Sequence, residues 1–464
     1  MSGLFGVVSK KDCRYLLFYG TDYHSHLGTQ KAGLAMMNHQ LQRCIHDIST
    51  SQFKSKFIEE IVKMKGTKGI GVISDSDPQP IIISSSFGNF ALAAGGLLGN
   101  KEKLIKEITS RGGSFSEMSG GRINTIEVIG KFIAQKENIP EGIKYVFNKI
   151  EGSISLLVLS KEGLWAARDP LGRTTLVIGQ KGETFAVASE SCAFPNLDFK
   201  VIKELRPGEI ILLTKNGLKT RRQVSSKGKI CAFLWIYTGY PASCYENISV
   251  ERVRENCGAN LAKGDKKIKA DFVTGIPDSG IAHALGYAMA AKIPYRRPLV
   301  KYTSGYDRSY TPPSQKIRDQ IANMKLIPIK EIIKGKKIVI CDDSIVRGTQ
   351  LKNQAIEKLW RHGAKEVHVR IACPPLMFPC KYNLSTRTRE ELAARRAIKK
   401  ISKQKSVDLK KFLNETTPEY RRMVEKIKKE LGVKTLKYQT VKQMIKAIGL
   451  PKGKICLYCW TGSS

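Results

Sequence analysis

The sequence has few acidic residues and no long apolar run. Its 464 residues include 41 aspartates and glutamates against 78 lysines and arginines, and the chain lacks any apolar stretch of about 18 residues. Its first residues, Met1 to Gly6, do not show the basic and then apolar pattern of a signal peptide. We therefore expect a cytosolic protein without a membrane partner. A hydrophobic content of 42% suffices for two or three domains with their own cores.

The shortage of acidic residues leaves a formal net charge of +37, which favours anionic partners such as phosphorylated metabolites, nucleic acid or acidic proteins. Residues 387–437 alone carry 17 basic and 7 acidic side chains in a helix-like stretch. We interpret this stretch as a solvated basic surface, because charge runs usually are solvated and no recognised nucleic-acid-binding module occurs. Nucleic acid is therefore not an expected partner.

The pattern of the chain changes near residue 229. Before it, short β-rich runs alternate with Gly, Asp and Asn turns, which predicts layered sheets. After it, the order becomes strand, loop and helix, with buried strands predicted at 271–274, 337–341 and 366–373. This order is typical of a parallel α/β sheet. Apolar residues at helical spacing predict a helix over 349–361.

One predicted strand ends in two carboxylates, Asp342 and Asp343, and continues into a loop before a helix. At such a strand end, the two acids can hydrogen-bond the vicinal hydroxyls of a ribose and help to hold Mg²⁺. The backbone N–H groups of the following loop can bind a phosphate at the helix N-terminus. Two adjacent acids can also be only a solvated turn or a helix cap. The predicted substrate-binding residues of the loop are Ser344, Ile345, Val346, Arg347, Gly348 and Thr349.

The whole pattern from Val339 to Thr349 resembles the signature of the phosphoribosyltransferases, and among them the amidophosphoribosyltransferases of purine synthesis. The resemblance implies a type I phosphoribosyltransferase domain over 230–464 that binds 5-phosphoribosyl 1-pyrophosphate. Segment 275–280 matches the family's pyrophosphate loop, which implies that Asp278, Ser279 and Gly280 bind substrate. By the same resemblance, Ser279 would bind Mg²⁺ together with Asp342 and Asp343.

Residues 301–312 are similar to the family's mobile lid, and Lys325 lies in its Lys-Leu-x-Pro-Ile segment. The resemblance implies that Lys301, Arg308 and Lys325 neutralise the charge of the departing pyrophosphate. The bond from C1 to oxygen would loosen first, and ammonia would then attack an oxocarbenium-like carbon. A lid that orders on substrate binding would keep water out.

Four of the eleven cysteines, Cys231, Cys380, Cys456 and Cys459, match the ligands of a [4Fe–4S] cluster in the bacillus-type members of the family. The resemblance implies a structural cluster rather than disulfides, which a reducing cytosol disfavours. Zinc and buried free thiols remain alternatives, because thiolates suit either metal and a lone Cys-x-x-Cys pair is weak evidence.

Residues 2–229 resemble the family's N-terminal-nucleophile glutaminase domain, which implies an αββα sandwich. In that domain an N-terminal cysteine attacks glutamine while its own α-amine acts as the base. Here Ser2 takes its place, and a serine alkoxide is far harder to form at neutral pH. The likeness is carried by segments 3–8, 19–20, 28–35, 167–173, 187–194 and 206–209.

Other departures weaken the glutaminase site further. The oxyanion-hole Asn-Gly of the family aligns with Gly95-Gly96, and loss of one such donor costs about 2.7 to 4 kcal/mol in the transition state. The segment with the carboxylate-binding arginine is deleted near 74–80, and the acid that binds the α-amine aligns with Thr125. We therefore expect an inactive glutaminase domain.

The sequence thus predicts an amidophosphoribosyltransferase-like pentosyltransferase that makes 5-phosphoribosylamine and pyrophosphate from 5-phosphoribosyl 1-pyrophosphate and ammonia, the first step of purine synthesis. Ammonia would be free or come from a separate glutaminase, and the resemblance implies a homo-oligomer. Two alternatives without turnover stay open: a sensor of the same ligand, and a partner subunit of an active paralogue. Retention of the lid, Lys325 and both aspartates favours catalysis.

Overall fold

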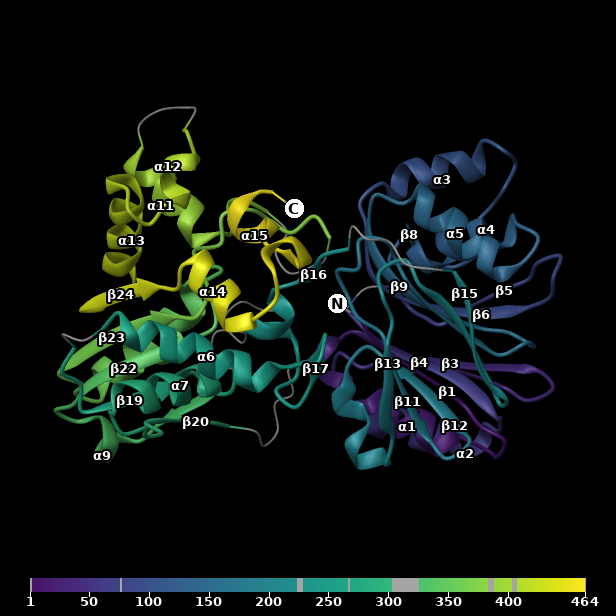
Figure 1. The fold of residues 1–464 in the computed structure, drawn as a ribbon, viewed down its shortest axis with the longest axis horizontal. Coiled ribbons are helices and arrows are strands. Elements are labelled where there is room, and N and C mark those ends of the chain that lie inside the picture. Colours follow the sequence, from purple (N-terminus) through teal and green to yellow (C-terminus); the bar gives the residue numbers. More distant parts are fainter. Residues whose placement is uncertain are drawn as a thin grey trace.

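The structure is a computed structural model in which the two halves of the chain lie side by side (Figure 1). The first half, purple to teal, contains two antiparallel sheets, and the second half, teal to yellow, contains a parallel sheet. In the part of the chain that the structure describes, no helix is long and apolar enough to span a bilayer. The described residues are 2–75, 77–222, 228–265, 268–302, 325–382, 388–402 and 407–463.

The two sheets of the first half have the strand orders β13-β11-β12-β1-β4-β2-β3 and β15-β14-β10-β9-β6-β5. The first consists of β1 (Ser2–Val8), β2 (Lys31–Met37), β3 (Leu41–Asp47), β4 (Lys68–Ser74), β11 (Val177–Lys181), β12 (Thr184–Ala188) and β13 (Lys200–Glu204). The second consists of β5 (Ile81–Ile83), β6 (Phe90–Leu98), β9 (Gly152–Leu159), β10 (Leu164–Arg168), β14 (Ile210–Thr214) and β15 (Gly217–Arg222). A short hairpin joins β7 (Met118–Ser119) and β8 (Arg122–Ile123).

These sheets form the two inner layers of a sandwich. Side chains alternate along each strand, so in β1 Leu4 and Val8 pack between the sheets while Phe5 and Val7 pack against helices. Burial on both faces explains why these strands are almost continuously apolar. The expected αββα architecture is confirmed. The outer layers are α1 (Arg14–Asp22) and α2 (Phe53–Lys63) on one sheet and α3 (Lys101–Thr109), α4 (Thr125–Ala134) and α5 (Ile139–Lys149) on the other.

The second half is built on a parallel sheet with the order β19-β22-β23-β24. Its strands are β19 (Phe272–Gly275), β22 (Lys337–Asp342), β23 (Glu366–Ile371) and β24 (Thr435–Tyr438). Three of them are the strands that the sequence predicted. In β22, Val339 and Cys341 face α7, whereas Ile338 and Ile340 face the opposite side.

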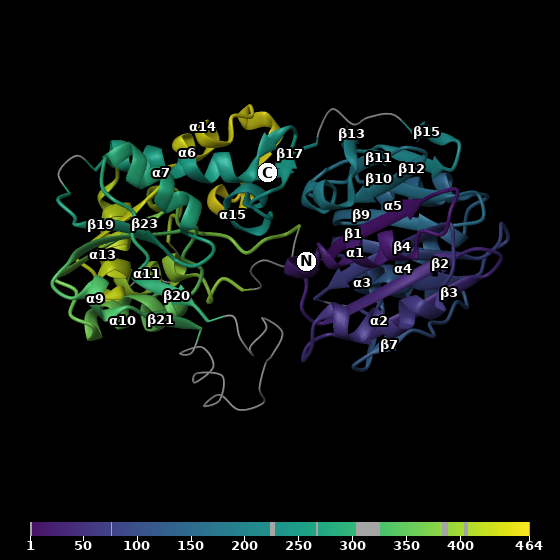
Figure 2. The same ribbon diagram turned by 90° about the horizontal axis from the view of Figure 1, so that it is seen from below.

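Helices cover both faces of this sheet (Figures 1 and 2). The predicted helix over 349–361 forms, although its first part has π-helical geometry. The longer elements are α6 (Val250–Lys263), α7 (Ile281–Ala291), η5 (Leu351–Ile356), α10 (Glu357–Arg361), α11 (Ala393–Ile401), α13 (Pro418–Leu431) and α14 (Val441–Ile448). Shorter ones are η4 (Leu234–Thr238), β17 (Cys244–Tyr245), β18 (Ile248–Ser249), β20 (Leu299–Lys301), β21 (Leu326–Pro328), α9 (Lys330–Ile333), α12 (Lys410–Leu413) and α15 (Tyr458–Thr461).

A short parallel ladder marks the junction of the two halves. It pairs β16 (Ile230–Cys231), which follows the first half, with β25 (Ile455–Cys456), which precedes α15. Cys231 lies opposite Cys456 in this ladder. The ladder therefore returns the last part of the described chain to the point where the second half begins.

Arg168 and two glutamates form a second contact between the halves. The Arg168 side chain is 1% exposed and donates to Glu246 Oε1 at 3.3 Å, and the N–H of Glu246 donates to Glu204 Oε2 at 2.7 Å. Burial, and then the charge of Glu246, raises the pKa of Glu204 to about 7. The surroundings of Glu204 in this contact therefore favour the protonated form of its carboxyl group.

We expect Glu204→Gln to stabilise the protein at pH 8 and to have a much smaller effect at pH 5. The pKa of Glu204 is about 7 in the folded protein and 4.5 in the unfolded chain. The stabilisation that its protonated carboxyl group contributes is therefore complete below pH 4.5 and is lost as the pH rises through 7. The gain at pH 8 is on the order of 3 kcal/mol. Denaturant unfolding at both pH values measures it, with the exposed Glu162→Gln as control. Equal stability of variant and wild type at pH 8 contradicts the assignment.

Candidate active site

The carboxyl ends of β19 and β22 bring two predicted site segments together. The strands are parallel neighbours, with Gly275 opposite Cys341, so the loops that follow them meet at one edge of the sheet. There, the Ser279 hydroxyl donates to Asp342 Oδ1 at 2.9 Å. The fold therefore joins the predicted pyrophosphate loop to the predicted aspartate pair.

Asp342 and Asp343 are 8% and 4% exposed. Burial raises the pKa of both carboxyl groups, and the charge of Asp343 raises that of Asp342 further. Their hydrogen bonds come from Ser279, from the Ser344 hydroxyl and from the N–H of Asp343. A buried acidic pair with hydroxyl donors and no ion-pair partner among the described residues is suited to a cation, because a cation restores the ionised forms.

The loop after the aspartates can bind an anion. The backbone N–H groups of residues 345–348 have no hydrogen-bond partner among the described residues, and the loop runs directly into the helix that contains η5. Gly348 has a φ of 80°, a left-handed conformation that favours glycine. Free N–H groups at a helix N-terminus form a site for a phosphate. We call residues 342–349 the aspartate cradle.

The side chain of Arg347 lies away from this anion site. Its guanidinium forms an ion pair with Glu391, which precedes α11. Arg347 therefore contributes to the aspartate cradle through its backbone. The same holds for its apolar neighbours Ile345 and Val346. Thr349 begins the helix and is exposed.

Of the predicted cations, Lys301 lies at the pyrophosphate loop, and Lys325 directly precedes the strand that pairs with β20. Lys301 Nζ is 2.6 Å from Asp278 Oδ2, so β20 and the loop are linked by an ion pair. Pairing of β20 with β21 brings the exposed Lys325 to the same hairpin, where its carbonyl accepts from Tyr302 N–H. Gly280 is required because a Cβ would lie 2.2 Å from the Cys341 carbonyl oxygen. Arg308 and residues 303–312 of the predicted lid lie outside the described residues.

In the first half, Ser2, Gly95 and Gly96, which align with glutaminase site residues, line one small cavity. The cavity has a volume of about 30 Å³, whereas one water needs at least about 10 to 15 Å³. The Ser2 hydroxyl donates to Ser74 Oγ at 3.2 Å, and Thr125 does not line the cavity. The Ser2 cavity is therefore narrow in this structure.

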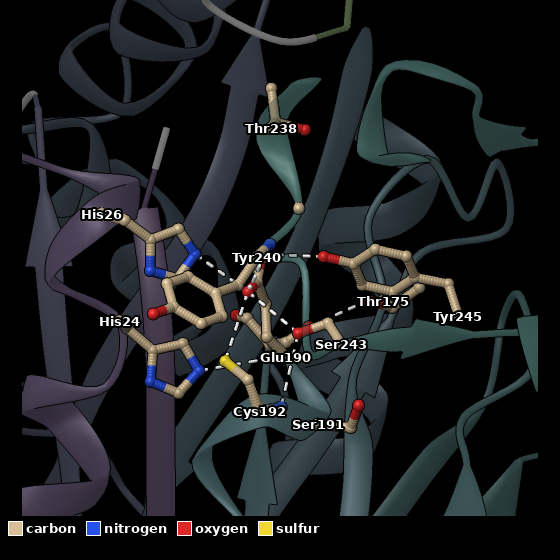
Figure 3. A network of polar contacts seen from close by, with 12 residues as sticks. His24, His26, Thr175, Glu190, Ser191, Cys192, Thr238, Tyr240, Ser243 and Tyr245 are labelled. Carbon is tan, nitrogen blue, oxygen red and sulfur yellow. Dashed lines mark hydrogen bonds and ion pairs between the residues drawn. The ribbon is translucent and has the colours of Figure 1, made fainter. Parts of the chain in front are cut away.

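Glu190, at the wall of the Ser2 cavity, is a residue whose role the sequence did not predict. Figure 3 shows it at the centre of a polar network between the two halves. Its carboxylate accepts from Tyr245 Oη at 2.7 Å, His26 Nε2 at 2.9 Å and Tyr240 N at 3.1 Å. Burial opposes ionisation, but the charge of His26 and the hydrogen bonds outweigh it and lower the pKa of Glu190 to about 2.

The four singled-out cysteines also converge. Cys231 in β16, Cys380, Cys456 in β25 and Cys459 in α15 line one small cavity, together with Arg173, Phe233, Tyr382, Tyr458 and Trp460. Burial raises the pKa of Cys231 and Cys456, and the charge of Arg173 acts in the opposite direction. Within the described ranges, no three His, Cys, Asp or Glu side chains are placed so that together they could hold a single metal ion. We call this space the cysteine cavity.

Known proteins match both halves. Residues 68–196 match the family model of a glutamine amidotransferase domain. The chain is 31% identical to an amidophosphoribosyltransferase of Methanocaldococcus jannaschii, over 100% of this chain and 97% of that protein. It is also 31% identical to one of Bacillus subtilis, over 99% and 93%.

A solved structure of the glutamine phosphoribosylpyrophosphate amidotransferase of B. subtilis, complexed with ADP and GMP, has the same fold. It aligns with a TM-score of 0.85 at 31% identity and covers 99% of this chain and 96% of that one. Similarity in sequence and in fold thus extends over the full length of the chain. The chain belongs to the amidophosphoribosyltransferase family.

Proposed function

We propose that this protein forms 5-phosphoribosylamine and pyrophosphate from 5-phosphoribosyl 1-pyrophosphate and ammonia, the first step of purine synthesis. The observation that carries the proposal is the contact between Ser279 and Asp342, which unites the pyrophosphate loop with the aspartate cradle. Membership of the family supports the same reaction. Residues 2–229 and 230–464 would be its two domains.

Each part of the substrate has a matching group in the site. Asp342 and Asp343 would hold the ribose diol, and the free N–H groups of 345–348 would hold the 5-phosphate. Asp278, Ser279 and Gly280 would bind the pyrophosphate. Ser279, Asp342 and Asp343 fit Mg²⁺, since they combine two buried carboxylates with a hydroxyl oxygen. When bound, Mg²⁺ would supply positive charge to the leaving group.

The chain's own residues explain how the bond at C1 would break. Lys301 lies at the pyrophosphate loop, and Lys325 stands across the same hairpin, so both would stabilise negative charge as pyrophosphate departs. Arg308 would add a third cation from the lid. The aspartate cradle would fix the sugar so that ammonia meets an oxocarbenium-like C1.

Ammonia, rather than glutamine, is the proposed nitrogen donor. The two glycines that line the Ser2 cavity offer no side-chain donor for an oxyanion. A serine hydroxyl is also a weaker nucleophile than the family's cysteine thiolate. A separate glutaminase or an active paralogue in a mixed oligomer could deliver the ammonia. We propose a homo-oligomer as the basic assembly.

Pyrophosphate release from 5-phosphoribosyl 1-pyrophosphate tests the function. We expect release with Mg²⁺ and ammonium chloride, and none without a nitrogen donor. Binding of the substrate with no release under either condition would instead indicate a sensor or a non-catalytic partner subunit. Mixing the protein with a paralogue that has its own glutaminase cysteine separates those two, because only a partner subunit changes the paralogue's rate.

We further propose that the cysteine cavity holds a [4Fe–4S] cluster. Four thiols line one enclosed space, and the N–H of Tyr382 donates to Cys380 Sγ at 3.4 Å, as backbone N–H groups do at such clusters. Around one zinc ion, thiolate sulfurs lie within roughly 4 Å of one another, because each Zn–S bond is about 2.3 Å. A cluster binds each thiolate to a different iron and accepts a wider arrangement. The bound cluster would hold together the junction between the two halves.

Replacement of one ligand tests the cluster. We expect anaerobically reconstituted wild type to bind about four irons per chain and to absorb visible light, since cysteine thiolates hold all four irons. Cys459→Ser should lose most of this iron and unfold at a lower temperature. Cys244→Ser, an exposed cysteine of the same half, serves as the control. Stoichiometric zinc, or full iron in Cys459→Ser, contradicts the proposal.

A further inference from the structure

Arg173 belongs to the first half of the chain but reaches the cysteine cavity of the second. Its side chain is 3% exposed and lies over the Tyr382 ring, with the guanidinium carbon 4.4 Å from the ring centre. One terminal nitrogen donates to the carbonyls of Leu171 and Lys229 at 3.0 Å and 2.9 Å. Its backbone carbonyl accepts from Cys231 N–H at 3.1 Å. The residue is therefore fixed beside a cluster ligand.

One requirement of this side chain is not met by the described residues. Arg173 Nε is buried and has no hydrogen-bond partner there, although the charge of the guanidinium acts on the buried Asp169 carboxyl group. A buried donor without an acceptor is destabilising, because it loses its hydrogen bonds to water and gains none in the protein. Arg173 lines the cysteine cavity, where an anionic, sulfur-rich group would supply an acceptor and a further counter-charge.

We propose that Arg173 tunes the cluster by presenting its free Nε–H and its positive charge to the thiolate-bound iron–sulfur group. The inference rests on the proposed cluster. Arg173 would then be the residue through which the first half stabilises the cluster, although all four cysteine ligands lie in the second half. Its role concerns the cluster and not the aspartate cradle.

The sign of the effect follows from charge. A thiolate-bound cluster is anionic, and reduction adds one further negative charge. A nearby buried cation stabilises the reduced form more than the oxidised form, so Arg173 should raise the reduction potential. Removing the cation should therefore make the cluster harder to reduce.

Another cation near the cavity provides a matched control. Lys381 Nζ lies 5.1 Å from the centre of the Tyr458 ring, and Tyr458 also lines the cysteine cavity. Lys381 is exposed, so water and salt screen its charge. Replacement of Lys381 should change the cluster far less than replacement of Arg173, although each removes one positive charge from the same region.

The experiment compares wild type, Arg173→Met, Arg173→Lys and Lys381→Met after anaerobic reconstitution with iron and sulfide. Iron content and far-ultraviolet circular dichroism establish loading and folding, and a potentiometric titration followed in the visible range gives the potential. We expect Arg173→Met to shift the ratio of oxidised to reduced cluster at least tenfold toward the oxidised form at a fixed ambient potential, which is 59 mV for one electron. Arg173→Lys keeps the charge but not the planar donor, and it should fall between. Lys381→Met should match wild type.

The outcomes separate this inference from the cluster proposal. A wild type that binds no iron overturns both. A loaded wild type whose potential is unchanged in Arg173→Met and Arg173→Lys overturns the role of Arg173 and leaves the cluster intact. If Arg173→Met fails to fold, Arg173→Lys decides: an unchanged potential counts against the inference, and a lowered one supports it.

Discussion

Asp342→Asn should lower kcat/KM for 5-phosphoribosyl 1-pyrophosphate with ammonia by roughly 10³-fold, a loss comparable to removal of one key electrostatic contact from a transition state. The amide keeps the shape of the side chain but cannot carry the negative charge that the ribose diol and Mg²⁺ require. Asp342 also anchors the pyrophosphate loop by accepting from Ser279. Initial rates of pyrophosphate release across substrate concentrations measure the effect.

Asp271→Asn is the matched control for that variant. Asp271 lies at the opposite edge of the same sheet, where it accepts from Lys337 N–H at 2.6 Å, and it is exposed. It should retain nearly full activity. An Asp342→Asn enzyme within tenfold of wild type would show that the aspartate cradle does not hold the sugar, whereas equal losses in both variants would indicate damage to the sheet.

Glutamine should support product formation at least about 10²-fold more slowly than ammonia, because one missing oxyanion-hole donor alone costs that much. Rates with glutamine and with ammonium chloride, at equal pH and saturating 5-phosphoribosyl 1-pyrophosphate, measure the ratio. Added glutaminase should restore the rate with glutamine by releasing free ammonia.

The variant Ser2→Cys sharpens this test. It supplies the family's nucleophile but leaves Gly95 and Gly96 without a side-chain donor, so glutamine should remain a poor substrate. Ammonia-dependent activity should be unchanged, because the aspartate cradle lies in the other half. Rapid pyrophosphate release by the wild type with glutamine alone would overturn this account of the first half.

The aspartate cradle could be predicted because its signal is local. An apolar strand, two acids, a glycine with positive φ and a helix follow one another within a few residues, and each has a strong preference of its own. The contact between Ser279 and Asp342 also follows from a general rule, since neighbouring parallel strands end at one edge of a sheet. The pattern alone did not reveal that Arg347 points to Glu391.

The network around Glu190 could not be predicted in the same way. Its partners His26 and Tyr245 are distant in the sequence on either side, and each is an ordinary residue in its own segment. Only the packing of the two halves gives them a common role. The orphan Nε of Arg173 is similar, because an unpaired donor is a property of the surroundings and not of the arginine.

The parallel ladder between β16 and β25 affects how the protein folds during its synthesis. Cys231 leaves the ribosome long before Cys456, so the first half can complete its sandwich while the junction still lacks one of its two strands. Until β25 is made, Ile230 and Cys231 lack their partner strand. Premature termination before β25 should therefore yield a polypeptide with a folded first half and an unpaired β16.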